Sequence, residues 1–295
     1  MMLRALIVGV FGVAVLQDGG SETEKLEKAV AAEINAKRKE QGLTELKVFE
    51  ELSYVARQQA EEFERQGIRG HQGREWGFVE ERANALFGWS VPTNQKPDAR
   101  QPAKDMMTDN SFDIDEEGHL GEGELRWVIE GWMNSRGHRE AILMKTTVYT
   151  GVGISSKRTR IFQIFASLTA PRARALEEIA RLAPDLDKGE ADALAAVGKI
   201  LALNEGAAVV RLAAVAKRSK SAKVQKKACE AVFQLNKKIR ALKGAVPELI
   251  DLLEVEATGE DSLKHLRSLT GQSLGKDANA WREWWASARK GFTVK

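Results

Sequence analysis

The chain has 295 residues, a length that is large for one compact domain and comfortable for two. With 43% hydrophobic and 29% charged residues it has the ordinary composition of a globular protein, and its single cysteine, Cys229, excludes an intramolecular disulfide. From Arg172 onward it has 23 Lys and Arg against 16 Asp and Glu, and before Arg172 it has 22 against 26. The first half is therefore acidic and the second half basic.

Residues 1–20 have the features of an export signal. Arg4 supplies positive charge, and the apolar run from Ala5 to Leu16 is long enough for a signal core but too short for a membrane span, which takes ~20 residues. Leu16 stands where a cleavage site prefers a small residue, so an uncleaved N-terminal anchor is one alternative. A buried first helix or strand of a cytoplasmic protein is another. We expect a secreted or periplasmic protein.

The next part of the chain is predicted to begin with helices. Ser21 and Glu24 have the spacing of a capping box, and the apolar residues that follow recur at helical spacing as far as Gly42. Similar apolar stripes predict helices over 50–66 and 124–133.

The hydrophobic period then changes to that of strands. Alternating residues predict a strand over 148–154, and a nearly continuous apolar run predicts a second, buried strand over 161–168. Helices followed by strands indicate an α+β fold with a sheet covered by helices. The first domain is predicted to span 21–170, with a junction at Pro171.

Residues 171–295 are predicted to form an all-α domain. Helix pairs restart every ~35–40 residues, as in helical-repeat proteins. The segment 269–285 resembles the closing helix of some bacterial HEAT-like proteins, whose stacks generally bind protein partners. Trp281, Trp284 and Trp285 share one face of that helix, which favours a cap over the end of the stack; a sugar-stacking platform is the alternative. We expect helices near 172–183, 188–203, 206–218, 221–236, 245–256, 260–270 and 278–290.

Three segments of the first domain carry recognisable motifs. They are the opening helices with INAKR at 34–38 and LSYVAR at 52–57, the dipeptide Gly70-His71, and GWMNSRGHR at 131–139, which is followed by GVG at 151–153. Together they resemble the bacterial branch of the CAP superfamily (cysteine-rich secretory, antigen 5 and pathogenesis-related proteins, also called SCP-like). The resemblance covers roughly half of the chain.

The resemblance implies an α-β-α sandwich with a surface cleft where two histidines and two acidic residues meet. His71 and His138 match the two histidines. Ala83 stands where family members have a glutamate at the start of a strand, so Glu81, just before it, and Glu130 are the candidates for the acidic pair.

Residues 113–124 have the acidic spacing of an EF-hand calcium loop. Acids fall at loop positions 1, 3, 5 and 12, with glycine at 6 and an apolar residue at 8. Calcium is a hard cation that takes six to eight oxygen ligands, and we expect weak, extracellular-grade affinity. A solvated acidic insertion is the alternative. The candidate ligands are Asp113, Asp115, Glu117, His119 and Glu124.

The segment from Lys217 to Lys243 has ten Lys and Arg and one acid, Glu230. A solvated helix face is the default interpretation, and contact with the acidic half of the chain is another. If the segment binds a partner, we expect an anionic envelope polymer. No nucleic acid is expected, because Phe233 alone is interleaved for stacking and export would separate the protein from the genome.

Two functions follow as the main alternatives. The first is an exported, non-enzymatic protein whose cleft binds a small apolar or envelope ligand and whose helical half docks an unidentified protein partner. The second is a metal-dependent hydrolase, such as a peptidase, with a zinc-like ion at His71, His138 and a nearby glutamate. A third is an adhesion module with no concave site, in which both histidines only hydrogen-bond neighbouring loops.

Overall fold

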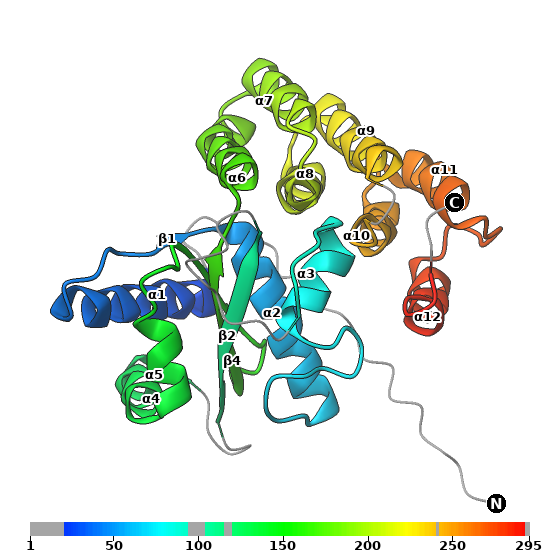
Figure 1. The fold of residues 1–295 in the computed structure, drawn as a ribbon. Helices are drawn as coiled ribbons and strands as arrows, with labels where there is room; N and C mark the ends of the chain where they lie inside the picture. Colours follow the sequence, from blue (N-terminus) through cyan, green and yellow to red (C-terminus); the bar gives the residue numbers. More distant parts are fainter. Residues whose placement is uncertain (1–20, 94–103, 115–119, 240–241, 293–295) are drawn as a thin grey trace, which may run out of the picture.

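The computed structural model describes residues 21–93, 104–114, 120–239 and 242–292. These residues form an α-β-α sandwich and a curved double layer of helices that arches over one side of it (Figure 1). The expected export signal, residues 1–20, lies outside the described residues. Among the helices that are described, none is both long enough and apolar enough to cross a membrane.

The sandwich is built on a sheet whose strands have the order β1-β3-β4-β2 in the described part of the chain. β1 pairs parallel with β3, whereas β3 with β4 and β4 with β2 are antiparallel. β2 is therefore an edge strand. In chain order the elements are α1 (Glu22–Glu40), β1 (Lys47–Val48), α2 (Glu50–Gln66), α3 (Val79–Phe87), β2 (Met106–Asp113), α4 (Glu122–Asn134), α5 (Arg136–Ile142), β3 (Tyr149–Ile154) and β4 (Arg160–Ser167).

Helices cover both faces of the sheet. α1, α4 and α5 pack on one face, where Ile34, Trp132 and Phe165 are fully buried (Figure 1). α2 and α3 pack on the other, where the rings of Phe63 and Phe162 meet edge to face with centroids 4.8 Å apart. The α+β class and the sandwich expected from the sequence are confirmed.

The helices expected near 21–42, 50–66 and 124–133 and both expected strands are present, as α1, α2, α4, β3 and β4. The stretch around Ala83, which was matched to the start of a strand, is instead part of helix α3. Val79, Ala83 and Leu86 are buried at helical spacing, and this stripe packs against the core. The prediction did not include β1, β2, α3 or α5.

The helical region consists of stacked helices in two layers. α7, α9 and α11 form the outer layer, and α6, α8, α10 and α12 form the inner layer, which faces the sandwich (Figure 1). All seven predicted helices are confirmed, and Asp277 caps the last one. The HEAT-like assignment stays a prediction. The bounds are α6 (Ala170–Leu182), α7 (Glu190–Ala202), α8 (Val209–Arg218), α9 (Ala222–Lys238), α10 (Ala245–Asp251), α11 (Gly259–Thr270) and α12 (Ala278–Ala288), with 3-10 turns η1 (Ala183–Asp187), η2 (Gly206–Ala208) and η3 (Leu252–Glu254).

The inner layer docks on the C-terminal end of α3. The backbone N–H of Lys243 donates to the carbonyl oxygen of Ala85 (2.8 Å), and that of Gly244 donates to the carbonyl oxygen of Leu86 (3.2 Å). The last carbonyls of a helix have no partner inside it, so these two bonds cap α3. One apolar cluster continues from α2 and α3 into the helical region. The two halves of the chain therefore share a core.

A substitution of Gly206, at the start of η2, tests this close packing. An added Cβ at Gly206 would overlap the backbone carbonyl oxygen of Phe87. We expect Gly206→Ala to lower the free energy of unfolding by about 1–3 kcal/mol, the usual cost of overpacking a core. Urea denaturation measures the change.

The matched control is Gly198→Ala in α7, where an added Cβ meets no atom within 4 Å. This variant should gain up to about 1 kcal/mol, because alanine is the better helix former. Equal effects of the two substitutions would contradict the close approach of η2 to α3.

Candidate functional site

The structure brings His71 and His138 together at the free edge of β2. His71 lies in the loop after α2, and His138 lies in the first turn of α5, on the opposite side of the sheet. Their ring centroids are 5.9 Å apart. The convergence expected from the sequence, across 67 residues of chain, is therefore present.

Two neighbouring residues of β2 hold this pair. Oδ2 of Asp109 lies 2.8 Å from Nδ1 of His71. The side-chain amide of Asn110, which points to the other face of the strand, donates to the carbonyl oxygen of His138 (3.2 Å). Because successive strand residues point to opposite faces, one strand fixes both histidines.

Asp109 was not among the residues that the sequence singled out. It lies four residues before Asp113, where the expected calcium loop starts, and no motif marks it. The other two acidic candidates contact their own helices. Glu81 accepts from the backbone N–H of Phe78 (2.9 Å) and so caps α3. Glu130 pairs with Arg126 on the exposed side of α4 (2.9 Å). The carboxylate that contacts the histidine pair is Asp109.

The two imidazoles have opposite pKa shifts. The hydrogen bond that His71 donates to Asp109 raises the pKa of His71 above its ordinary 6.5, against the effect of partial burial. Burial lowers the pKa of His138, and the neighbouring charge on His71 lowers it further. Of the two rings, His71 is therefore the more readily protonated.

These shifts have opposite consequences for stability. The folded pKa of His71 lies above the unfolded value, so its contribution is fully present below the unfolded pKa and is lost as pH rises through the folded pKa. The folded pKa of His138 lies below the unfolded value. The free energy of unfolding therefore falls as pH decreases from the unfolded pKa of this histidine to its folded pKa.

The loop that carries His71 is anchored to α2 and α3 by buried polar groups. The side-chain amide of Gln59 donates to the carbonyl oxygen of His71 (3.1 Å). The backbone N–H of Glu75 donates to Oε1 of Glu62 (2.7 Å), and the other oxygen of Glu62 pairs with Arg82. Gln59, Glu62 and Arg82 are each at most 2% exposed, so this anchor is rigid.

The helical region holds the same loop from the other side. Oε1 of Glu75 accepts from Arg65 of α2 (2.8 Å) and from Arg289, which directly follows α12 (2.5 Å). The ring of Trp76 lies 6.5 Å from that of Trp285 in α12. The position of His71 therefore depends on the last helix of the chain.

The tryptophans of α12 belong to this contact. Trp281 is fully buried and Trp285 is 7% exposed, so the sugar-platform interpretation is wrong for both. Trp281 donates its indole N–H to the carbonyl oxygen of Gly275 (2.8 Å). The expected cap at the end of the helical stack also contacts the sandwich through Trp76.

A metal ion at the histidine pair lacks a full set of ligands. Catalytic zinc sites use three protein ligands and one open position. The residues that the structure describes contain no group of three or more His, Cys, Asp or Glu side chains placed to hold a metal ion. Asp109, the carboxylate hydrogen-bonded to this pair, already contacts Nδ1 of His71. The residues described therefore do not fit a three-ligand zinc site.

The calcium loop expected at 113–124 is only partly described. Asp113 is the last residue of strand β2 and lies 3.2 Å from Nε of Arg160. Oε2 of Glu124 accepts from the backbone N–H of Gly121 (2.9 Å), which caps α4. Asp115, Glu117 and His119 lie outside the described residues. Calcium binding stays a prediction.

Residues 31–167 match the model of the cysteine-rich secretory protein family, CAP. These residues form a CAP domain. The CAP domain is 29% identical over 133 residues to the uncharacterized protein YkwD of Bacillus subtilis, a match that covers 45% of this chain and 44% of that relative. The chain thus spans less than half of the length of this relative.

Two solved structures resemble the CAP domain. An extracellular protein with an SCP domain from Bacillus anthracis is 17% identical, with a TM-score of 0.38, over 48% of this chain and 40% of that one. An outer surface protein of Borrelia burgdorferi is 18% identical, also with a TM-score of 0.38, over 50% of this chain and 97% of that one.

Asp109→Asn tests the CAP-domain site directly. Loss of the carboxylate removes the main cause of the raised pKa, so we expect the pKa of His71 to fall to its ordinary value or below it. A pH titration of the imidazole resonances by NMR measures the shift. Glu130→Gln is the control and should leave both histidines unchanged. An unmoved His71 in Asp109→Asn would show that the contact does not form in solution.

The calcium expectation has its own measurement. Millimolar calcium should raise the melting temperature, because a ligand that binds only the folded state stabilises it by mass action. Glu124→Gln should remove the effect, and Glu130→Gln, on the same helix, should retain it. An unchanged melting temperature with calcium, together with no binding by calorimetry, would contradict calcium binding.

Proposed function

We propose that the chain is an exported protein whose CAP domain binds a small ligand or a partner at the cell envelope without chemical turnover. The support is the convergence of His71, Asp109 and His138 at the open edge of β2. The side chain of His71 is 40% exposed while Asp109 beneath it is 7% exposed. A fixed imidazole is thus presented to solvent by a buried carboxylate.

The donor set favours binding over metal-dependent turnover. Nδ1 of His71 is occupied by Asp109, which leaves Nε2 directed to other partners. His138 supplies a second ring, with its centroid 5.9 Å from that of His71, and its lowered pKa favours the neutral imidazole. Two adjacent imidazoles suit a ligand with a carbonyl, carboxylate or phosphate oxygen, which accepts hydrogen bonds from both rings.

A metal-dependent hydrolase, such as a peptidase, is the second candidate, and one observation favours it. A carboxylate on Nδ1 fixes the tautomer that leaves Nε2 free, and this is how proteins orient histidines that bind metals or act as general bases. The Asp109–His71 contact has this form. A hydrolase would need a third ligand from the substrate or from outside the described residues.

The helical region offers the second half of the proposed function. Part of the basic segment is used internally, since Lys217 lies between Glu248 (2.8 Å) and Asp251 (2.9 Å). The outer face of α9 exposes further lysines, and within the described part of the chain they have no acidic partner. An anionic envelope polymer or an acidic protein surface fits this face. These lysines are Lys226, Lys227, Lys237 and Lys238.

Co-sedimentation with insoluble cell-envelope polymer tests the proposal. We expect wild-type protein to sediment with the polymer, and His138→Ala to weaken binding about 5-fold, because one hydrogen bond is worth about 1 kcal/mol. The double variant Lys226→Glu, Lys227→Glu isolates the contribution of α9, which should fall as salt rises.

Glu130→Gln and Lys264→Ala are matched controls on exposed surfaces outside both sites. Equal binding by wild type and His138→Ala would contradict a role for the pair of His71 and His138. Release of soluble fragments that requires added zinc, stops with a chelator and is absent in His138→Ala would favour the hydrolase instead. Fractionation of cells that express the full chain tests export.

A further inference from the structure

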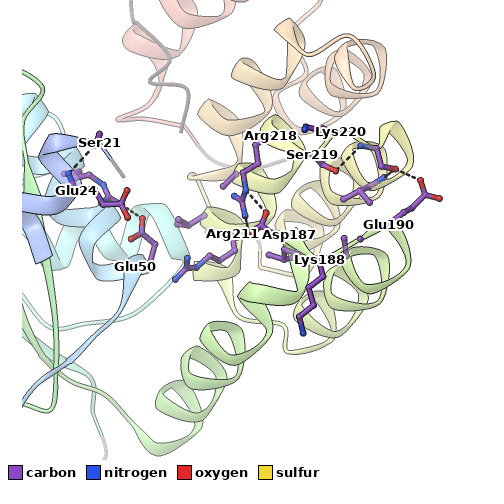
Figure 2. Close-up of a pocket in the computed structure, with 18 of the residues that line it drawn as sticks. Ser21, Glu24, Glu50, Asp187, Lys188, Glu190, Arg211, Arg218, Ser219 and Lys220 are labelled. Atoms are coloured by element: carbon purple, nitrogen blue, oxygen red, sulfur yellow. Dashed lines mark hydrogen bonds and ion pairs between the residues drawn. The ribbon is translucent and has the colours of Figure 1, made fainter. Parts of the chain in front are cut away.

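The groove between the CAP domain and the helical region offers few free charges, because its charged side chains are largely used in ion pairs within the chain. Arg57 binds Glu27 and Glu50, and Arg218 binds Asp187 (Figure 2). Unpaired polar groups lie instead along the open edge of β2. They belong to the backbone, so the fold itself places them.

The pairing of β2 with β4 shows which backbone groups face this edge. The two strands are antiparallel, and the N–H of Ile114, the residue after β2, donates to the carbonyl oxygen of Thr159 (2.9 Å). In an antiparallel pair alternate residues turn their N–H and C=O toward the partner strand. The residues two and four positions before Ile114 therefore also face β4. The backbone groups of Asp109, Ser111 and Asp113 face the open edge.

The outward backbone groups of Asp109 have no partner. No residue in the described part of the chain donates to its carbonyl oxygen or accepts from its N–H. Its side chain is 7% exposed although the residue as a whole is partly exposed, so its backbone reaches solvent. The carbonyl oxygen of Ser111 accepts from the indole N–H of Trp132 (2.9 Å) and keeps a second lone pair. Such an edge is a template for a further strand.

Side chains at the two ends of this edge favour a particular kind of strand. At Asp109, the imidazoles of His71 and His138 lie with their centroids 5.9 Å apart, and His71 is the more readily protonated. At Phe112, α4 presents the ring of Trp127, which is 57% exposed and meets the ring of Phe112 edge to face with centroids 5.0 Å apart. The first end suits a carboxylate, and the second suits an apolar or aromatic side chain.

We infer that the edge of β2 binds the last four residues of an extended peptide as an antiparallel strand. The last residue pairs with Asp109, and its carboxylate lies at His71 and His138. The residue three places earlier lies opposite Phe112, and its side chain contacts Trp127, because residues opposite each other in a sheet share a face. This peptide-binding role rests on the function proposed for the histidine pair, since it names the ligand of that site.

The backbone of the peptide supplies the groups that the edge lacks. The N–H of its fourth residue donates to the carbonyl oxygen of Asp109, and one carboxylate oxygen accepts from the N–H of Asp109. The second residue pairs with Ser111 in the same way. The N–H of the third residue, which lies opposite Asn110, points away from β2. Methylation of the peptide nitrogens can therefore distinguish the two kinds of position.

Calorimetry with the full chain tests this pairing, with the acetylated tetrapeptide FAAA and its free carboxylate as the probe. We expect N-methylation of the fourth residue to weaken binding about 5-fold, because one hydrogen bond to Asp109 is lost. N-methylation of the third residue is the matched control and should leave the affinity unchanged. A C-terminal amide in place of the carboxylate should weaken binding about 10-fold, because hydrogen bonds to a charged group are stronger.

Variants of the protein test the two other parts of the site. Ser111→Pro removes an N–H that faces the open edge and keeps the ladder with β4, and it should weaken binding about 5-fold. Trp127→Ala should remove the preference for FAAA over AAAA, which we expect to be about 5-fold in wild type. Arg126→Ala, at a neighbouring position that is 88% exposed, is the control and should bind as wild type does.

The results separate the peptide site from the broader proposal. Equal affinity for the two N-methylated peptides, no binding at millimolar peptide, or an unchanged preference in Trp127→Ala would each overturn it. Sedimentation with envelope polymer that is weakened in His138→Ala would then still support the proposed function. Peptide binding without such sedimentation would support the edge site and contradict a polymer ligand.

Discussion

The backbone contact between the end of α3 and the turn before α10 fixes how the two halves of the chain are arranged. Carbonyl groups that are buried without a partner are costly, and those of Ala85 and Leu86 obtain their donors from Lys243 and Gly244. Around this contact, buried Glu205 accepts from the indole N–H of Trp89 (2.7 Å). Separating the halves would leave these groups unpaired as well as exposing the shared core, so the helical region is a structural part of the protein.

The same arrangement reaches the candidate site. Arg289 and Trp285, at the end of the chain, contact Glu75 and Trp76 in the loop that carries His71. Displacement of α12 from α2 would break the Arg289–Glu75 ion pair and remove one anchor of this loop. Because the hydrogen bond to Asp109 is the main cause of the raised pKa of His71, the protonation of this histidine is linked to how the helical region packs on the loop.

Most of the fold could be predicted from local periodicity, and the part that could not explains the errors at the site. Apolar stripes located the helices because their spacing is a property of each segment. β2 has no such signature, since Asp109, Asn110 and Asp113 interrupt it, and it is defined by pairing with β4 more than 40 residues later. The acids nearest the motifs by position, Glu81 and Glu130, serve their own helices. Asp109 joins His71 only through the sheet, which no local pattern reveals.

The uneven charge of the sequence is only partly neutralised by folding. Glu51 of the acidic half is paired with Arg211 of the basic half, and Glu75 is paired with Arg289, so several opposite charges meet across the junction. Other cations pair within the helical region, Lys188 with Asp185 (2.7 Å) and Arg218 with Asp187 (2.9 Å). The lysines on the outer side of α9 are exposed, and their charge is directed to solvent.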